Sequence, residues 1–277
     1  MSAKSSVLYD VPGPRARIRN HALSVVAGLA LLGGLWYVFT SLDDAGQFSA
    51  EMWDVFAYKN TQETILTALL DTLKAFATAA VLSLVFGALL AIGRLSDHKP
   101  VRAVCTAVVQ FFRAMPLLIM IFGLYVAVFT ATPFWALVTG LTLYNGAVQA
   151  EIIRSGMNAV PRGQSEAGYA LGLRKTQVMT VILTPQAIRA MLPAIIGQLV
   201  VTLKDTSLGY VITYPELLYV GKTIAATWVT PDGYPYIPVA IVIGVIYILC
   251  CLLLTALAKW LEGWSRRGAN RRTTSAA

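Results

Sequence analysis

Charged residues are scarce in this chain, and their scarcity excludes a water-soluble protein. Of 277 residues only 13% are Asp, Glu, Lys or Arg, whereas 57% are hydrophobic and the mean hydropathy is +0.65. Soluble domains usually carry about 25% charged residues and fewer apolar ones. One globule of this length cannot bury so much apolar surface, so we expect a membrane protein with several spans. The same composition excludes a disordered chain.

Cysteine is also rare. The three cysteines, Cys105, Cys250 and Cys251, lie inside apolar runs. Their spacing fits neither a disulfide framework nor a set of metal ligands, and apolar packing is the expected role. The chain also lacks the G-x-x-x-x-G-K-[ST] loop that binds nucleotide phosphates. We therefore expect no metal, no catalytic residue, no cofactor and no ATP hydrolysis in this chain itself.

Long intervals without charge locate the expected membrane spans. Four intervals of 19 to 37 residues contain no Asp, Glu, Lys or Arg, and a helix needs about 20 residues to cross the hydrocarbon core. The longest interval is divided near Thr130–Pro133, where proline predicts a tight turn. A further apolar segment after Arg189 is interrupted only by Lys204 and Asp205. We predict six spans, at about 20–42, 66–93, 104–129, 134–153, 190–213 and 235–258.

The distribution of lysine and arginine predicts the orientation of these spans. Of 22 such residues, 17 fall in the N-terminal segment, in the loops after the second and fourth spans and in the C-terminal tail. Only Lys59 and Lys222 fall on the opposite side, and three others lie in or near spans. Because cytoplasmic loops carry an excess of Lys and Arg, we expect both termini in the cytoplasm.

The longest predicted cytoplasmic loop, 154–189, contains the signals of one short helix. Gly163 punctuates its start, and Ser165 is a suitable N-cap that would place Glu166 in the first helical turn. Gly172 suits the left-handed position just after a helix. A helix of about seven residues is not stable alone in water. We expect it either to dock on a partner or to fold back on its own bundle.

Small side chains make docking the favoured alternative for this helix. Ala167, Gly168 and Ala170 cover much of its surface. Small residues permit close approach of another backbone, as in other helix contacts built on Gly and Ala. The physical expectation is therefore a short docking helix on the cytoplasmic side.

Several segments, in order along the chain, resemble the membrane subunits of ABC importers. Glu166-Ala-Gly168, Leu171-Gly172 and Pro185-Gln-Ala187 resemble their EAA loop. Other segments are similar to motifs of the polar amino acid permease family: Phe112-Arg-Ala-Met-Pro-Leu-Leu118, Glu151-Ile-Ile-Arg-Ser-Gly156, Val160-Pro-Arg-Gly-Gln164, Lys204-Asp-Thr-Ser-Leu208 and Pro215-Glu-Leu217. Each motif alone is weak, but the ordered set is specific and extends over roughly residues 65–260.

The chain departs from this family pattern at three places. Ala114-Met115 stands where the family usually has Gly-Thr, which leaves the identity of the cargo open. Gly168 replaces the second alanine of the EAA core, and Thr184 replaces a leucine before the proline. Neither of the latter changes should prevent a docking helix.

The resemblance implies an all-α integral membrane protein with a five-span importer core and a cytoplasmic coupling helix. An additional N-terminal span, too long for a signal peptide, would raise the number of transmembrane helices to about six. The expected regions are three. Residues 1–64 hold the cytoplasmic N-terminus, the first span and an acidic external loop; residues 65–260 form the transmembrane domain with its coupling loop at 154–189; residues 261–277 form a basic cytoplasmic tail.

The function implied by the resemblance is that of a permease subunit in an ATP-driven importer of polar amino acids, with glutamate, aspartate or glutamine as the favoured cargo. The implied partners are a cytoplasmic ATPase dimer that binds ATP and Mg, a second permease chain, an extracytoplasmic substrate-binding protein and membrane lipid, with no nucleic acid. The implied location is the plasma membrane of a prokaryote. Whether the second permease is identical or merely related stays open, as does whether this subunit holds a cargo site.

The resemblance also assigns two sets of candidate residues. The set that would contact the ATPase is Gly163, Ser165, Glu166, Ala167, Gly168, Leu171 and Gly172. The set that would line the substrate pathway is Arg113, Pro116, Lys204, Asp205, Thr206 and Ser207.

Three of the pathway candidates carry charge, and each has a structural alternative. Lys204 and Asp205 lie about a dozen residues into their span, where ionisable groups usually face a bundle interior or an aqueous cavity. They could instead bond to another span, or lie where the helix unwinds. Arg113 could extend to the cytoplasmic headgroups.

Two functions of other classes compete with this interpretation. A self-sufficient secondary carrier would have inverted repeats and broken helices in both halves, whereas the chain shows no internal repeat. A membrane receptor or scaffold could use the short cytoplasmic helix to recruit another partner. Such a scaffold has little use for Arg113, Lys204 and Asp205 inside spans.

Overall fold

The computed structural model describes the backbone of residues 13–274 and the side chains of residues 13–260. Residues 1–12 of the predicted N-terminal region, residues 275–277 of the predicted basic tail and the side chains of residues 261–274 therefore lie outside the described residues. The described chain is helical almost throughout, and its only β-type pairing is an isolated bridge between Thr230 and Gly233. The all-α expectation is confirmed.

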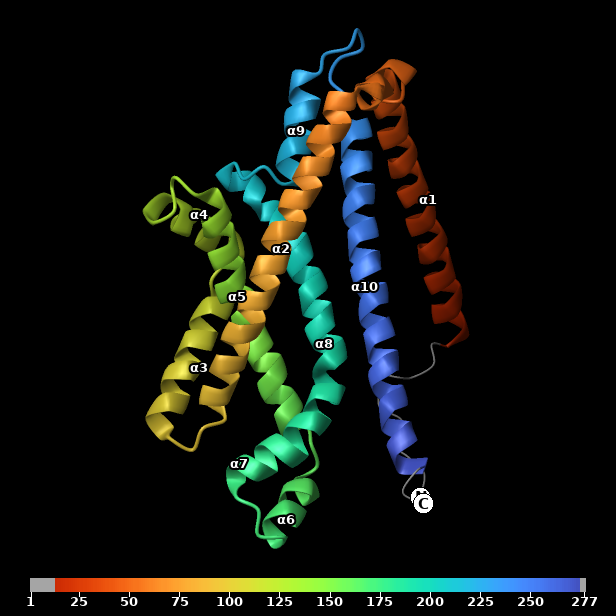
Figure 1. Ribbon diagram of the computed structural model, residues 1–277. Coiled ribbons are helices and arrows are strands. Elements are labelled where there is room, and N and C mark those ends of the chain that lie inside the picture. Colours follow the sequence, from red (N-terminus) through yellow and green to blue (C-terminus); the bar gives the residue numbers. More distant parts are fainter. Residues whose placement is uncertain (1–12, 275–277) are drawn as a thin grey trace.

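Ten α-helices and three other helical segments follow one another in the described chain (Figure 1). The α-helices are α1 (Pro14–Asp44), α2 (Lys59–Arg94), α3 (Lys99–Ala114), α4 (Leu117–Ala127), α5 (Pro133–Asn158), α6 (Arg162–Ala170), α7 (Lys175–Gln177), α8 (Thr184–Asp205), α9 (Leu217–Thr227) and α10 (Tyr236–Thr274). The others are the 3-10 helices η2 (Ala50–Ala57) and η4 (Thr206–Ile212) and the π-helix η3 (Val178–Leu183). We call the end of the bundle with α6, α7 and η3 the α6 end, and the opposite end, with η2 and α9, the α9 end.

Four helical segments of the described chain are long and apolar enough to cross a membrane, and a bent pair of helices would make five. The four are Pro14–Asp44, Lys59–Arg94, Lys175–Ile212 and Tyr236–Trp260. The expected span 134–153 forms α5, which is less apolar because it carries Asn145 and Gln149, and it is not among them. The count of six spans stays a prediction.

The expected span 104–129 is wrong as a single helix. It divides into α3 and α4, whose axes differ by 98°. Met115 takes extended backbone angles immediately before Pro116, because the proline ring disfavours the α conformation in the residue before it. The predicted turn before Pro133 is confirmed by the end of α4 at Ala127 and the start of α5.

Helices α2 and α5 form the closest pair in the bundle. A Cβ atom at Gly87 would lie 2.7 Å from the carbonyl oxygen of Gly146, so the two backbones approach each other as only glycine permits. A polar link also joins α5 to α8, since Gln198 Nε2 donates to Asn145 Oδ1 at 2.7 Å. Helix α5 also packs against α3, α4 and η4, so five helical segments meet on it.

Helix α1 differs from the other long helices because none of its residues is buried. It lies beside α10 at the edge of the bundle (Figure 1). Its attachment comes after the helix, where Gln47 donates to the carbonyl of Tyr234 at 3.1 Å and accepts from the N–H of Ile237 at 3.1 Å. A helix that is apolar all round and unpacked is suited to contact with lipid.

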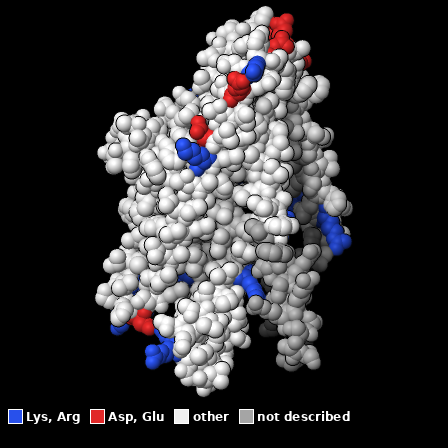
Figure 2. All heavy atoms as spheres, in the orientation of Figure 1, with Lys and Arg blue, Asp and Glu red and all other residues white. Residues whose placement is uncertain are grey.

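Charges on the visible face of the molecule are few, and most of the surface between the two ends carries none (Figure 2). Large apolar side chains such as Leu35, Val85 and Leu253 are exposed along this part of the helices. An apolar band with few charges is the surface expected of helices that cross a bilayer.

Candidate functional site

The short helix predicted in the loop 154–189 is present as α6, but its start differs from the prediction. The helix begins at Arg162 with Pro161 at the N-cap position, and it has nine residues. Ser165 is therefore not the N-cap; its hydroxyl donates to the carbonyl of Arg162 at 2.8 Å, as serine commonly does inside a helix. Glu166 lies after the first turn, not in it, and its side chain is exposed.

The end of α6 matches the prediction. Gly172 has φ +78°, the left-handed conformation that glycine adopts at no steric cost after a helix. Next to it Leu171 is 81% exposed, and Tyr169 is 49% exposed. The tip of the loop therefore presents apolar surface beyond the bundle.

Gly168 faces the chain itself and not a partner. It is buried, and a Cβ atom there would lie 2.8 Å from Ile182 Cδ1 and 3.0 Å from Val178 Cγ2, both in η3. Ala167 and Ala170 stay exposed. The two alternatives for the helix are thus combined: one face packs on its own bundle, and the other is free for contact.

The π-helix that receives α6 has a local cause. Pro185 lacks an N–H and its ring disturbs the preceding turn, and the N–H of Thr184 reaches back five residues to the carbonyl of Met179. The Thr184 hydroxyl donates to the same carbonyl at 2.7 Å. Val178 and Ile182 of this π-helix lie against Gly168, so α6 packs directly on the segment that leads into α8.

A cluster of ion pairs surrounds Glu151 toward the α6 end. Its carboxylate pairs with the guanidinium of Arg94 from α2 and with that of Arg154 from α5, and Arg113 of α3 lies 3.7 Å away. The side chain of Arg94 is only 8% exposed. One carboxylate therefore joins three helices just before α5 leads into α6.

Arg113 is thus held beside Glu151, although it lies only three residues before another pathway candidate, Pro116. The structure does not bring it into contact with Lys204 or Asp205; its charge is turned toward Glu151. The expectation that it extends to the headgroups misses this intramolecular partner.

A second ion pair at the α6 end joins the two loops there. Lys175, at the start of α7, pairs with Asp97 in the α2–α3 loop. The hydrogen bond and the charge of Lys175 hold the pKa of Asp97 below its usual value. Both side chains are largely exposed, so the pair contributes little to stability.

Lys204 and Asp205 lie where α8 changes into the 3-10 helix η4. The α-helix ends at Asp205, and η4 continues from Thr206. Lys204 is exposed and Asp205 partly buried, and neither belongs to an ion pair within the described residues. Thr206 is fully buried, and its hydroxyl donates to the carbonyl of Leu203 at 2.6 Å. The helix therefore tightens here and does not unwind, so the alternative of an unwound segment is wrong.

Pro116 and the Lys204–Leu208 segment are brought to the same part of the bundle. Leu117, which follows Pro116 in α4, packs against the same buried cluster as Leu208 of η4. That cluster includes Ile121, Leu137 and Ile212. The bend at Pro116 therefore directs α4 toward η4, whereas Arg113 contacts Glu151.

Glu216 organises the start of α9 and was noticed in the sequence only as part of a motif. Its carboxylate accepts from the N–H groups of Leu218 at 2.7 Å and Tyr219 at 2.8 Å, as an N-cap residue does. It also accepts from the hydroxyl of Tyr247 in α10 at 2.7 Å. The side chain is completely buried.

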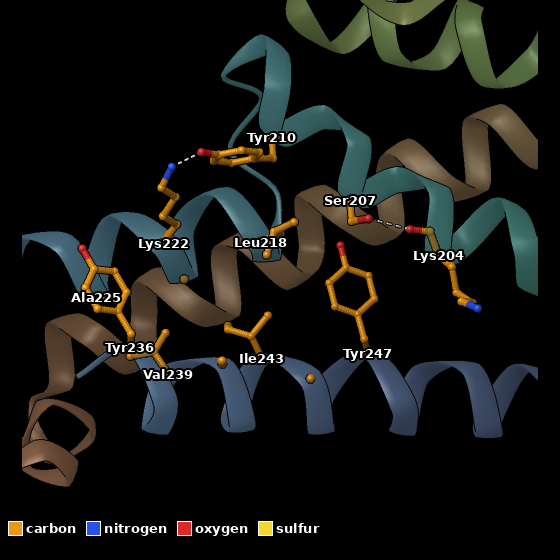
Figure 3. A pocket seen from close by; sticks show the side chains of 13 residues that line it. Lys204, Ser207, Tyr210, Leu218, Lys222, Ala225, Tyr236, Val239, Ile243 and Tyr247 are labelled. Carbon is orange, nitrogen blue, oxygen red and sulfur yellow. Dashed lines mark hydrogen bonds between the residues drawn. The ribbon is translucent and has the colours of Figure 1, made fainter. Parts of the chain in front are cut away.

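Two cavities beside α9 were not predicted. One, of about 550 Å³, lies between η4, α9 and α10 (Figure 3). The other, of about 530 Å³, lies between the end of η4 and α9. Tyr210 and Lys222 line both cavities. The sequence predicts only that Lys222 lies on the side opposite the cytoplasm, and no spacing in the sequence joins Lys222 to Tyr210.

Metal ligands are not gathered anywhere in the described chain, where no group of three or more His, Cys, Asp or Glu side chains could hold an ion. The arrangement is one of binding surfaces and helix contacts.

Comparison with protein families gives one match that spans most of the chain. Residues 83–267 match the family described as binding-protein-dependent transport system inner membrane component. The glutamate transport system permease protein GluD of Corynebacterium glutamicum is 40% identical over 239 residues, which cover 83% of this chain and 86% of that protein. The glutamate/aspartate import permease protein GltK of Escherichia coli is 32% identical over 213 residues, covering 72% of this chain and 92% of that protein.

The fold also matches a solved structure of an amino acid ABC transporter with histidines. The TM-score is 0.67 at 29% sequence identity, and the match covers 73% of this chain and 94% of that one. The relatives are named as transport components.

Proposed function

The chain belongs to the family of binding-protein-dependent transport system inner membrane components, and from that premise we propose that it is a permease subunit of an importer for acidic amino acids, driven by a separate ATPase. Membership makes it a multi-pass inner-membrane subunit of an amino acid ABC transporter. The cargo, the coupling to the ATPase and the orientation are parts of the proposal.

The choice of cargo rests on the relatives. The two curated relatives described above are named for glutamate and for glutamate and aspartate. We propose glutamate or aspartate as the cargo, with glutamine as a neutral alternative, since a probable glutamine permease of Bacillus subtilis is 31% identical over 233 residues.

The observation that carries the coupling proposal is the two-sided helix α6. Gly168 seats one face on η3, while Glu166, Tyr169 and Leu171 stay exposed at the tip. Exposed apolar side chains beyond an apolar band are suited to a protein partner. We propose that the ATPase dimer, which would bind ATP and Mg, receives this tip, with Gly163, Ser165, Ala167 and Gly172 shaping it.

The remaining parts of the proposal concern partners and orientation. The excess of Lys and Arg in the loops of the α6 end favours a cytoplasmic position for that end and for both termini. A related permease would complete the pathway, and an extracytoplasmic binding protein would deliver the cargo to the α9 end. Pro116, Lys204, Asp205, Thr206 and Ser207 remain the proposed pathway residues, and Arg113 now has a place beside Glu151.

The test is purification of the tagged chain from its own host in mild detergent. We expect an ATPase and a second permease to co-purify in fixed proportion. Glu166→Lys should remove the ATPase and abolish uptake while leaving membrane insertion intact, whereas the matched charge reversal Glu63→Lys at the α9 end should retain the ATPase. Retention of the ATPase and normal uptake by Glu166→Lys would overturn the coupling proposal.

The alternative of a self-sufficient carrier has no support among the relatives. It makes an opposite prediction for the same preparation. The chain reconstituted alone into liposomes would then accumulate glutamate without ATP, and our proposal would fail.

A further inference from the structure

The Lys222–Tyr210 pair lies where the two cavities of the α9 end meet. The ammonium of Lys222 donates to the Tyr210 hydroxyl and lies 4.6 Å from the centre of the Tyr210 ring. Figure 3 shows the two side chains pointing toward each other, Lys222 from α9 and Tyr210 from η4. A ligand entering either cavity would therefore meet the same cation.

The cavity between η4 and α9 has the chemistry of an anion site. Four hydroxyl residues besides Tyr210 line it: Thr213, Tyr219, Thr223 and Thr227. No acidic residue lines either cavity, and no carboxylate of the described chain lies within ion-pair distance of Lys222. The hydroxyls of Thr223 and Thr227 donate to carbonyls of their own helix, so Thr213 and Tyr219 supply the further hydroxyls near Lys222. A cation whose partner is a neutral phenol is matched by a carboxylate.

The other cavity, between η4, α9 and α10, contributes apolar surface on the other side of the Lys222–Tyr210 pair. Leu218, Val239 and Ile243 line it together with Tyr236. The methylene groups of an amino acid side chain can lie against such surface while its charged end meets the cation. The two cavities together provide one polar and one apolar wall for a small anion.

The backbone beside the site is strained. Thr213 has φ +57° and is the only residue other than glycine with positive φ in the described chain. This conformation is unfavourable for a β-branched side chain, and such strain is usually retained at functional sites. Thr213 follows η4 directly and lines the hydroxyl-rich cavity.

The site is continuous with the proposed pathway. Lys204 and Ser207 of the Lys204–Leu208 motif line the apolar cavity, and Tyr210 follows them in the same helical segment. We propose that Lys222, together with Tyr210, binds the side-chain carboxylate of the cargo at the α9 end and so selects acidic over neutral amino acids. This inference rests on the proposed function and names the residue that would set its specificity.

Direct binding to the purified importer tests the site without the selectivity of the external binding protein. The permease–ATPase complex in nanodiscs of neutral lipid is titrated with glutamate and, separately, with glutamine. Wild type should prefer glutamate. Lys222→Met should raise the Kd for glutamate about 10- to 100-fold, the loss expected for one charge-assisted hydrogen bond, and leave the Kd for glutamine within about twofold.

Three further variants separate recognition from structure. Lys222→Arg should restore most of the affinity for glutamate, because it restores the charge. Tyr210→Phe should weaken glutamate binding less than Lys222→Met does, since it removes a neutral partner. Lys59→Met removes a lysine at the same end that pairs with Glu63 and should change neither ligand.

Several results would overturn the inference. Equal weakening of glutamate and glutamine by Lys222→Met would indicate a structural role, and no binding of glutamate by wild type would remove the site. Binding of anionic phospholipid that depends on Lys222, with glutamate binding unaffected, would assign the site to a lipid headgroup. In each of these cases the proposed function would stand if the wild-type complex retains its ATPase and takes up glutamate when ATP is supplied. A wild-type chain that neither binds an ATPase nor takes up glutamate with ATP would refute the proposed function itself.

Discussion

The two ends of the bundle are each organised around one glutamate, but the partners of the two carboxylates are of opposite kinds. Glu151, toward the α6 end, is surrounded by the guanidinium groups of Arg94, Arg113 and Arg154. Glu216, toward the α9 end, accepts from two backbone N–H groups and a phenol, all neutral. The arrangement around Glu151 depends on the attraction between opposite charges, whereas the arrangement around Glu216 depends on the direction of hydrogen bonds from neutral donors.

This difference suggests different mechanical roles. The attraction between opposite charges persists when the angles of the hydrogen bonds from Arg94 and Arg154 to Glu151 change, so we expect this cluster to hold α2, α3 and α5 together if α6 moves. The hydrogen bonds of Glu216 fix the start of α9 against α10 in one geometry. We therefore expect movement at the α6 end and rigidity around the cavities of the α9 end.

The largest effect is expected from Glu151→Ala. It removes the carboxylate and leaves three cations together, one of them almost buried, at a cost of about 3 kcal/mol, the lower part of the range for broken buried pairs because Glu151 is partly exposed. Thermal unfolding in detergent measures the cost. Because the remaining repulsion is between charges, salt near 1 M should recover part of it.

The matched control for this prediction is Glu63→Ala. Glu63 also pairs with a cation, Lys59 at 3.6 Å, but both side chains are largely exposed. Its removal should leave the melting temperature unchanged. Equal loss in both variants would contradict the charge-based account of the cluster.

A smaller effect is expected from Glu216→Ala, about 2 kcal/mol, from the lost N-cap and the buried donors left without an acceptor. The same unfolding experiment at low and high salt distinguishes the two ends. Salt should not recover the Glu216 variant, because its partners are neutral. If high salt restored the stability of the Glu216 variant as much as that of the Glu151 variant, the proposed difference between the two ends would be wrong.

The smallest effect is expected from Asp97→Asn, which breaks the exposed pair with Lys175. Since Lys175 lowers the pKa of Asp97, the pair stabilises the fold above the usual pKa of aspartate and loses this contribution as the pH falls through the lowered value. The melting temperatures of variant and wild type should therefore differ slightly at pH 7 and converge in acid. A difference in melting temperature that grows as the pH falls would contradict this prediction.

Much of the fold could be predicted because membrane spans depend on composition. Charge-free intervals located α1, α2, α5 and the apolar part of α10, and the local preference of glycine predicted the left-handed Gly172. The bend at Pro116 was missed, although the rule that places a turn before Pro133 also disfavours helix at Met115. The apolar composition of this stretch favoured the prediction of one continuous span.

The parts that could not be predicted depend on contacts between distant residues. Ser165 has the right chemistry for an N-cap, but the helix starts at Arg162 and the hydroxyl bonds inside it. Nothing in the sequence pairs Arg113 with Glu151 or Lys222 with Tyr210. Helix α9 was missed because its eleven residues are too few to span a membrane.

The π-helix η3 has a consequence for chain length. A π-turn closes over five residues where an α-turn closes over four, so η3 accommodates the equivalent of one inserted residue between α7 and α8. A homologue lacking one residue in Val178–Leu183 could form an ordinary helix there and keep the same face of α8 toward α5. A deletion further along α8 would turn the following face by about 100° and separate Gln198 from Asn145. Single-residue deletions inherited in this family should accordingly be tolerated in η3 and selected against in the part of α8 before Gln198.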